Sequence, residues 1–209
     1  LSMPENLHKL FVISSPSGGG KTSLINKIFE DSRSANFEKS ISDTSRQKRQ
    51  GDLEGKDYYF LSEKDFKDKI KKEEYVEYAT VFGNFYGTSK EEIKTKYNNS
   101  NLILELDWQG AYAVKELFDD AKLIFLVPPS LDDLKQRLIK RNLDSSKEIE
   151  SRLSEAKKEI SKSEMYDYLV LNDDFDKAFE DLSQILFEGI SPIDFNSRAS
   201  KDLIKRLVE

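Results

Sequence analysis

The stretch LFVISSPSGGGKTSLINKIF, residues 10–29, decides how this chain folds. Its first four residues are all apolar and do not alternate with polar ones, which is typical of a strand buried on both faces of a sheet. A loop of serine, proline and glycine follows. Leu24, Ile25, Ile28 and Phe29 then recur at helical spacing. The order strand, glycine loop, helix predicts the first unit of an α/β fold.

The loop nearly matches the phosphate-binding (P-loop) pattern G-x-x-x-x-G-K-[ST]. Gly20, Lys21 and Thr22 complete the pattern, while Ser15 replaces its first glycine. Glycines let backbone N–H groups approach phosphate oxygens, and the following helix adds its N-terminal partial charge. In this pattern the lysine reaches the β- and γ-phosphates and the hydroxyl binds Mg²⁺. The alternative, a glycine-rich surface turn, is disfavoured by the strand before the loop and the helix after it.

The same alternation continues toward the C-terminus. Strands are expected at residues 102–107, 123–127 and 168–171, and helices at 111–118, 131–138, 149–160 and 178–186. Strands that alternate with helices imply a parallel sheet with right-handed crossovers. Because ligands bind at the carboxyl ends of such strands, Asn172 is expected near the adenine of ATP. The predicted ATP-binding residues are Ser14, Ser15, Pro16, Ser17, Gly18, Gly19, Gly20, Lys21, Thr22 and Asn172.

Residues 40–89 differ in character from the rest of the chain. They are polar and rich in Tyr, Arg, Asp and Gly. Turn signals occur at Gly51-Asp52, Gly55-Lys56 and Gly83-Asn84. Short strands are expected at 58–61 and 75–79, with a helix at 63–72. This composition predicts an inserted binding subdomain.

Composition excludes several function classes. The chain has 209 residues, 37% of them hydrophobic, which is enough for a core in one domain. A net charge of -6 argues against a nucleic-acid partner. With no cysteine, there are no disulfides or thiolate metal sites. No apolar run approaches the roughly 20 residues needed to span a bilayer, and the first residues lack a signal-peptide pattern. We therefore expect a cytoplasmic protein that does not bind membranes.

Within residues 40–89, several side chains suit a nucleoside monophosphate. Two guanidinium groups, those of Arg46 and Arg49, can grip a dianionic phosphate, and Tyr58 can complete its oxygens. A buried carboxylate such as Glu77 can accept both N–H groups of guanine, a donor pair that adenine lacks. Each residue also has an ordinary interpretation: a solvated basic loop, half-buried strand tyrosines and a surface glutamate. Spacing alone does not choose between them.

The chain resembles the guanylate kinase family from about residue 10 to residue 188. The blocks that carry the resemblance are residues 15–22, 42–51, 81–88, 106–111, 128–130 and 170–174. The serine-substituted P-loop resembles the family's own version. The chain departs from the family at Gln50, Asp52, Glu105 and Asn142, where proline, glutamate, aspartate and glycine are frequent. These changes affect fine geometry rather than the reaction.

The resemblance implies an ATP- and Mg²⁺-dependent kinase of GMP, and of dGMP, in purine nucleotide metabolism. The core would comprise residues 1–39, 90–131 and 161–209, the GMP-binding insertion 40–89 and a helical lid 132–160. The implied GMP-binding residues are Ser42, Arg46, Arg49, Tyr58, Glu77, Tyr86, Thr88 and Asp107. The implied catalytic residues are Lys21, Arg46, Arg137, Arg141 and Arg152, with Thr22 on the metal.

Some alternatives stay open at this stage. Arg137 and Arg141 share a helix face, so they could belong to a solvated charged surface. Asp107 could orient metal-bound water, or it could contact guanine. Two rival functions are a peptide-binding scaffold domain of the same fold and a kinase for another monophosphate. The retained Lys21 and Thr22 disfavour the first, and Glu77 with its neighbours disfavours the second. The oligomeric state is left undetermined.

Overall fold

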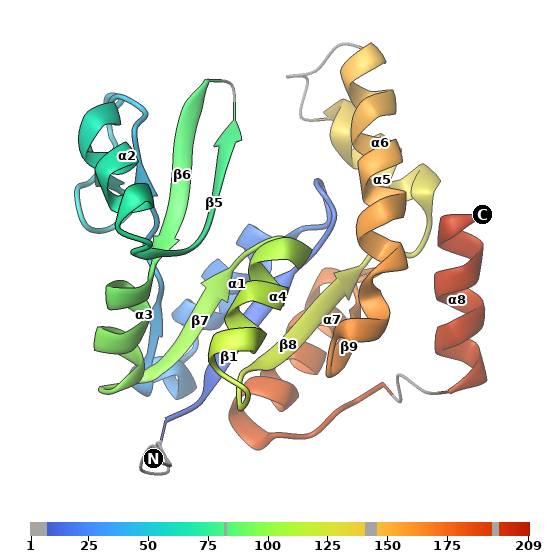
Figure 1. Ribbon diagram of the computed structural model, residues 1–209. Helices are drawn as coiled ribbons and strands as arrows, with labels where there is room; N and C mark the ends of the chain where they lie inside the picture. The colour runs from blue at the N-terminus through green and yellow to red at the C-terminus, as the bar shows by residue number, and fades with distance from the viewer. Residues whose placement is uncertain (1–7, 82, 141–145, 194–196) are drawn as a thin grey trace.

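A five-stranded parallel sheet forms the centre of the computed structural model, which describes residues 8–81, 83–140, 146–193 and 197–209 (Figure 1). The strand order is β2-β7-β1-β8-β9, and every neighbouring pair is parallel. The strands are β1 (Leu10–Ser14), β2 (Phe37–Lys39), β7 (Asn101–Glu105), β8 (Lys122–Val127) and β9 (Tyr168–Leu171). The predicted α/β class with a parallel core is confirmed.

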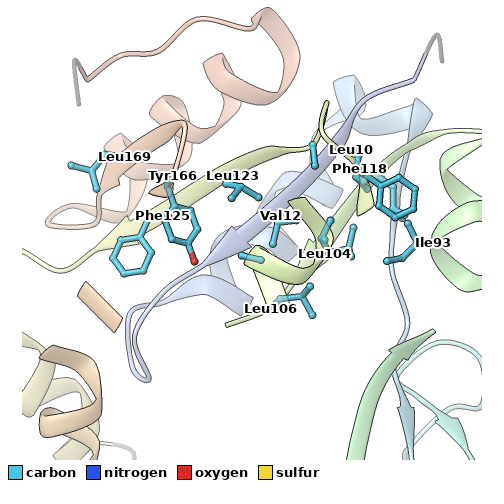
Figure 2. Packing of buried hydrophobic residues seen from close by; sticks show 14 of the residues in the cluster. Leu10, Val12, Ile93, Leu104, Leu106, Phe118, Leu123, Phe125, Tyr166 and Leu169 are labelled. Atoms are coloured by element: carbon cyan, nitrogen blue, oxygen red, sulfur yellow. The ribbon is translucent and has the colours of Figure 1, made fainter. Parts of the chain in front are cut away.

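Helices cover both faces of this sheet because alternate side chains of each strand point to opposite faces. Phe11 and Ile13 of β1 pack with α1 (Lys21–Glu30) and α7 (Phe175–Ser183). Leu10 and Val12 pack on the other face (Figure 2). The helices on that face are α3 (Lys90–Tyr97), α4 (Trp108–Leu117), α6 (Ser146–Ser161) and α8 (Arg198–Val208). Short helical turns lie at Ser32–Asn36, Ser163–Met165 and Gln184–Glu188.

A second, smaller sheet lies within the polar segment. Its order is β4-β3-β6-β5, in which β3 is parallel to β4 and antiparallel to β6. The elements are β3 (Asp43–Thr44), β4 (Tyr59–Phe60), α2 (Glu63–Lys71), β5 (Tyr75–Val81) and β6 (Asn84–Ser89). Phe66 of α2 stacks on Tyr75 and Phe85, which joins the helix to the sheet.

Two projections rise beyond the carboxyl ends of the central strands (Figure 1). One is the second sheet with α2. The other is the pair α5 (Leu131–Lys140) and α6, which contact each other. Arg141, a predicted catalytic residue between these two helices, lies outside the described residues. None of the helices in the described ranges combines the length and the apolar character that crossing a membrane requires.

The structure differs from the sequence prediction in several elements. Strand β7 ends at Glu105, two residues early, because Asp107 caps helix α4 by accepting a hydrogen bond from the N–H of Gly110 (2.9 Å). Helix α4 accordingly begins at Trp108 rather than residue 111. Residues 84–89, where the sequence shows only a turn signal at Gly83-Asn84, are strand β6. The strands β2 and β3 and the helices α3 and α8 were not predicted.

Candidate active site

The phosphate loop curls around a hollow of about 170 Å³, lined by residues 15–23. The N–H of Gly19 donates to the carbonyl of Pro16 (2.8 Å), which closes the turn. Gly20 has φ +88°, a left-handed conformation that favours glycine. A Cβ atom there would lie 2.4 Å from Nδ2 of Asn172. No other residue fits this position without displacing Asn172.

Asn172 is buried and hydrogen-bonds to the phosphate loop. Its Nδ2 donates to the carbonyl of Gly19 (2.6 Å), and its own carbonyl accepts a hydrogen bond from Arg137 (2.7 Å). One residue therefore joins the loop to helix α5. The contact of Asn172 with adenine stays a prediction.

Lys21 occupies the place that the pattern predicts, at the start of α1. Its Nζ donates to the carbonyl of Leu106 (3.0 Å). Burial lowers the pKa of the Lys21 ammonium group, while the carboxylates of Glu105, Glu159 and Asp107 oppose that shift. The ammonium group thus lies among acidic groups at the carboxyl ends of the central strands.

The next residue, Thr22, is tied to a carboxylate from β7. Its Oγ1 donates to Oε1 of Glu105 (2.5 Å), and Oε2 of Glu105 lies 2.7 Å from Nζ of Lys39. Burial alone would raise the pKa of Glu105, but hydrogen bonds from Lys39 and Thr22 lower it overall. In the sequence, Glu105 was noted only as a departure from the family's frequent aspartate. An acidic residue at the end of a strand could, however, have indicated a site residue.

A cavity of about 380 Å³ lies between the phosphate loop and the second sheet. Five predicted site residues line it: Lys21, Thr22, Ser42, Tyr58 and Thr88. Seven other lining residues were not predicted: Lys39, Ser40, Lys56, Asp57, Leu104, Glu105 and Leu106. Predicted ATP-binding and GMP-binding residues thus meet in one cavity.

A cationic and aromatic cluster lies on the second sheet. Arg46 donates to Oδ2 of Asp52 (2.9 Å), and this bond lowers the pKa of that carboxyl. The guanidinium carbon lies 5.4 Å from the ring centroid of Tyr58, which contacts Tyr86 edge-on at 5.7 Å. Arg49 is exposed, and its backbone N–H donates to Asp52 (2.7 Å). Three predicted phosphate ligands are therefore adjacent, while the Arg49 side chain is at the surface.

Glu77 and Thr88 form a polar pair across strands β5 and β6. The hydroxyl of Thr88 donates to Oε1 of Glu77 (2.7 Å). Burial raises the pKa of the Glu77 carboxyl; Thr88 opposes the shift and Asp107 adds to it. Gly110 allows α4 to approach, because a Cβ there would lie 3.1 Å from Cγ of Glu77. The pair therefore offers hydrogen-bond acceptor oxygens at a position that is only partly exposed to water.

Helix α6 reaches the phosphate loop from the other projection. Arg152 donates to Oγ of Ser17 (3.1 Å). On the same helix, Glu159 interacts electrostatically with Lys21 and Asp107. Burial, opposed by Lys21 and reinforced by Asp107, raises the pKa of Glu159 to about 7. Sequence reasoning did not include Glu159 in the site.

The phosphate loop, the parallel sheet and the cavity beside the loop define a P-loop nucleotide-binding protein. The sequence model described as guanylate kinase matches residues 7–189. A guanylate kinase of Wolbachia sp. subsp. Brugia malayi is 46% identical over 184 residues, which are 87% of this chain and 93% of that protein. One of Hahella chejuensis is 47% identical over 178 residues, 85% of each chain.

Structural comparison agrees with these sequence matches. The crystal structure of guanylate kinase from Anaplasma phagocytophilum aligns over 100% of both chains with a TM-score of 0.67 and 32% identity. The chain belongs to the guanylate kinase family. The reaction of this family transfers a phosphoryl group from ATP to GMP, so these proteins are nucleoside monophosphate kinases.

Proposed function

We propose that this chain transfers the γ-phosphoryl group of ATP to GMP, and to dGMP, giving ADP and the nucleoside diphosphate. The cavity of about 380 Å³ carries this proposal, because Lys21 and Thr22 line it together with Ser42, Tyr58 and Thr88. A donor phosphate at the loop and an acceptor at the second sheet would share one cavity. In-line transfer requires this proximity.

On the donor side, backbone N–H groups within residues 17–22 cradle the phosphates of ATP. Lys21 supplies a positive charge at the β- and γ-phosphates, exchanging its bond to Leu106 for phosphate oxygens. The buried Asn172 keeps the loop in shape through Gly19. Pre-formed donors of this kind stabilise charge in the transition state without reorganisation.

The residues present fit Mg²⁺. Thr22 and Glu105 offer a hydroxyl and a carboxylate oxygen within 2.5 Å of each other, and this hard cation prefers oxygen ligands. No cluster of three or more His, Cys, Asp or Glu suited to a metal occurs among the residues that the structure describes. Thr22, with Glu105 beside it, would hold Mg²⁺, which would supply positive charge against the charge that develops on the phosphates.

On the acceptor side, Arg46, Arg49, Tyr58 and Tyr86 bind the GMP phosphate. Arg46 must exchange its bond to Asp52 for the phosphate. Glu77, Ser42 and Thr88 read the guanine, with Glu77 accepting from N1–H and N2–H₂. Asp107 caps helix α4, and its negative charge contributes to the raised pKa of Glu77. We infer that the reaction takes place in the cytoplasm.

The projection 132–160 acts as a lid that carries Arg137, Arg141 and Arg152 to the phosphates, and the insertion 40–89 acts as the GMP-binding subdomain. Arg137 donates to the backbone carbonyl of Asn172, and Arg152 donates to Ser17. Both contacts lie beside the phosphate loop, so the two guanidinium groups lie near the site proposed for the phosphates of ATP. A closed lid also excludes water, which limits ATP hydrolysis.

Closure on binding both substrates is expected, because the charge-neutralising arginines and the acceptor residues belong to separate projections. An analogue that joins adenosine and guanosine through phosphates should compact the protein in small-angle scattering. Arg137→Ala should lower kcat about 10- to 100-fold, because it removes one charged hydrogen bond. The affinity for GMP should change little. Identical scattering profiles and an unaltered kcat would contradict the lid.

The direct test of the function is an ADP-release assay with GMP, dGMP, AMP, UMP and dTMP as acceptors. We expect turnover with GMP and dGMP only, and only when a divalent metal is present. Turnover with AMP or a pyrimidine nucleotide would contradict the assignment of Glu77. No turnover with any acceptor would favour a binding module of the same fold.

A further inference from the structure

Lys39 lies at the junction between the central sheet and the second sheet. It is the last residue of β2, and its carbonyl accepts a hydrogen bond from Nζ of Lys96 (2.8 Å). The N–H of the following Ser40 donates to the carbonyl of Ile103 (2.9 Å). The backbone of Lys39 is therefore fixed at the carboxyl end of an edge strand.

The side chain of Lys39 points into the cavity between the donor and acceptor residues. It is 37% exposed and lines the cavity together with Thr22 and Tyr58. Its Nζ contacts one oxygen of Glu105 (2.7 Å), and the other oxygen holds Thr22 (2.5 Å). The carboxylate of Glu105 thus lies between the ammonium group of Lys39 and the hydroxyl of Thr22, which is the proposed metal ligand.

Two ammonium groups interact with the carboxylate of Glu105. Lys39 contacts it directly, and Lys21 interacts with it through space. The charges of Lys21 and Lys39 also repel each other. A divalent cation at Glu105 would compete with Lys39 for the same carboxylate. The lysine side chain is flexible, so its ammonium group can exchange Glu105 for a phosphate oxygen.

We propose that Lys39 is a further catalytic residue, which contacts the phosphates at the point of transfer when both nucleotides are bound. This inference rests on the proposed function. The ion pair with Glu105 holds the ammonium group of Lys39 at the cavity. With both nucleotides bound, that group neutralises negative charge between the γ-phosphate and the acceptor phosphate. Phosphoryl transfer depends mainly on positioning and such charge neutralisation.

The test compares Lys39→Gln, Lys39→Arg and the control Lys122→Gln. Glutamine can still bond to Glu105 but carries no charge. Lys122 is exposed at the start of β8, at the opposite end of the sheet. Lys39→Gln should lower kcat for GMP about 10- to 100-fold, as expected for losing a charged hydrogen bond. It should weaken binding of an adenosine–guanosine pentaphosphate by a similar factor, with an unchanged Kd for ADP and Mg²⁺.

Lys39→Arg should keep most of the activity, and Lys122→Gln should match the wild type, with equal melting temperatures in all four proteins. An unchanged kcat in Lys39→Gln would overturn the proposal. Equal weakening of ADP and pentaphosphate binding would overturn it as well, because Lys39 would then act only through Glu105. Failure of the wild type to phosphorylate GMP would refute the proposed function itself.

Discussion

Replacing Lys21 by alanine is expected to lower kcat for GMP phosphorylation about 10²- to 10³-fold, the usual cost of removing one pre-organised charge-stabilising donor. The ammonium group lies at the phosphate loop, and its hydrogen bond goes to the carbonyl of Leu106 rather than to a core side chain. Burial lowers the pKa of this group because desolvation disfavours its charged form. Steady-state kinetics with ATP and GMP measure the loss.

The matched control is Lys27→Ala on the same helix α1. Lys27 is exposed, and its Nζ forms an ion pair with Oε2 of Glu30, 3.0 Å away. Exposed pairs of this kind contribute little to stability, so kcat should stay within about twofold of the wild type. Both variants should melt as the wild type does. Wild-type activity in Lys21→Ala with an unchanged melting curve would remove the P-loop assignment.

The parts of the fold that could be predicted are those in which a local pattern reflects burial. Residues 10–13 form β1 because a strand at the centre of a parallel sheet is covered on both faces, which leaves an unbroken apolar run. Residues 123–127 form β8 for the same reason. The phosphate-binding loop could be predicted because close approach of the backbone to phosphate requires small residues at fixed spacing.

The missed elements lack such a pattern. Strand β2, with the sequence FEK, lies at the edge of the sheet and lacks the unbroken apolar run of a strand that is buried on both faces. Helix α3 buries only Ile93 and Tyr97 of its eight residues. Helix α8 did carry a signal that was not used: Ser197 caps it, and Leu207 is buried in the core with neighbouring apolar residues packed against it.

The site divides in the same way. Lys21 and Thr22 belong to a local motif, so the sequence points to them, whereas the role of Glu77 was implied by the family resemblance. Lys39 belongs to no such motif, because its role depends on a carboxylate 66 residues away. Adjacent parallel strands bring such residues together, but single-sequence patterns carry no information about which strands are neighbours. Ion pairs across a sheet are therefore found only in the structure.

Glu77→Gln is expected to lower kcat/KM for GMP roughly 30- to 3,000-fold, the range for truncating one partner of a buried charged hydrogen bond. The carboxylate offers only acceptor oxygens, whereas the amide presents N–H donors toward the N–H groups of guanine. Thr88 already fixes one carboxylate oxygen by donating to it (2.7 Å). KM for ATP should change by less than about twofold, since Glu77 lies on the acceptor side.

We also expect Glu77→Gln to change how the stability of the fold depends on pH. Burial raises the pKa of Glu77 above its ordinary 4.5, so the folded state binds this proton more tightly than the unfolded state. The free energy of unfolding therefore falls as pH rises from about 4.5 through the raised pKa. A neutral glutamine removes this loss, so ligand-free Glu77→Gln should melt at or above the wild-type temperature at pH 8.

Glu91→Gln is the matched control, because Glu91 is exposed in the first turn of α3. It should leave both KM values and the pH dependence of melting unchanged. If Glu77→Gln raises KM for ATP and GMP equally, Glu77 does not read the base. If it melts lower than the wild type at pH 8 while losing GMP activity, the carboxylate stabilises the fold, and the loss of activity follows from that role.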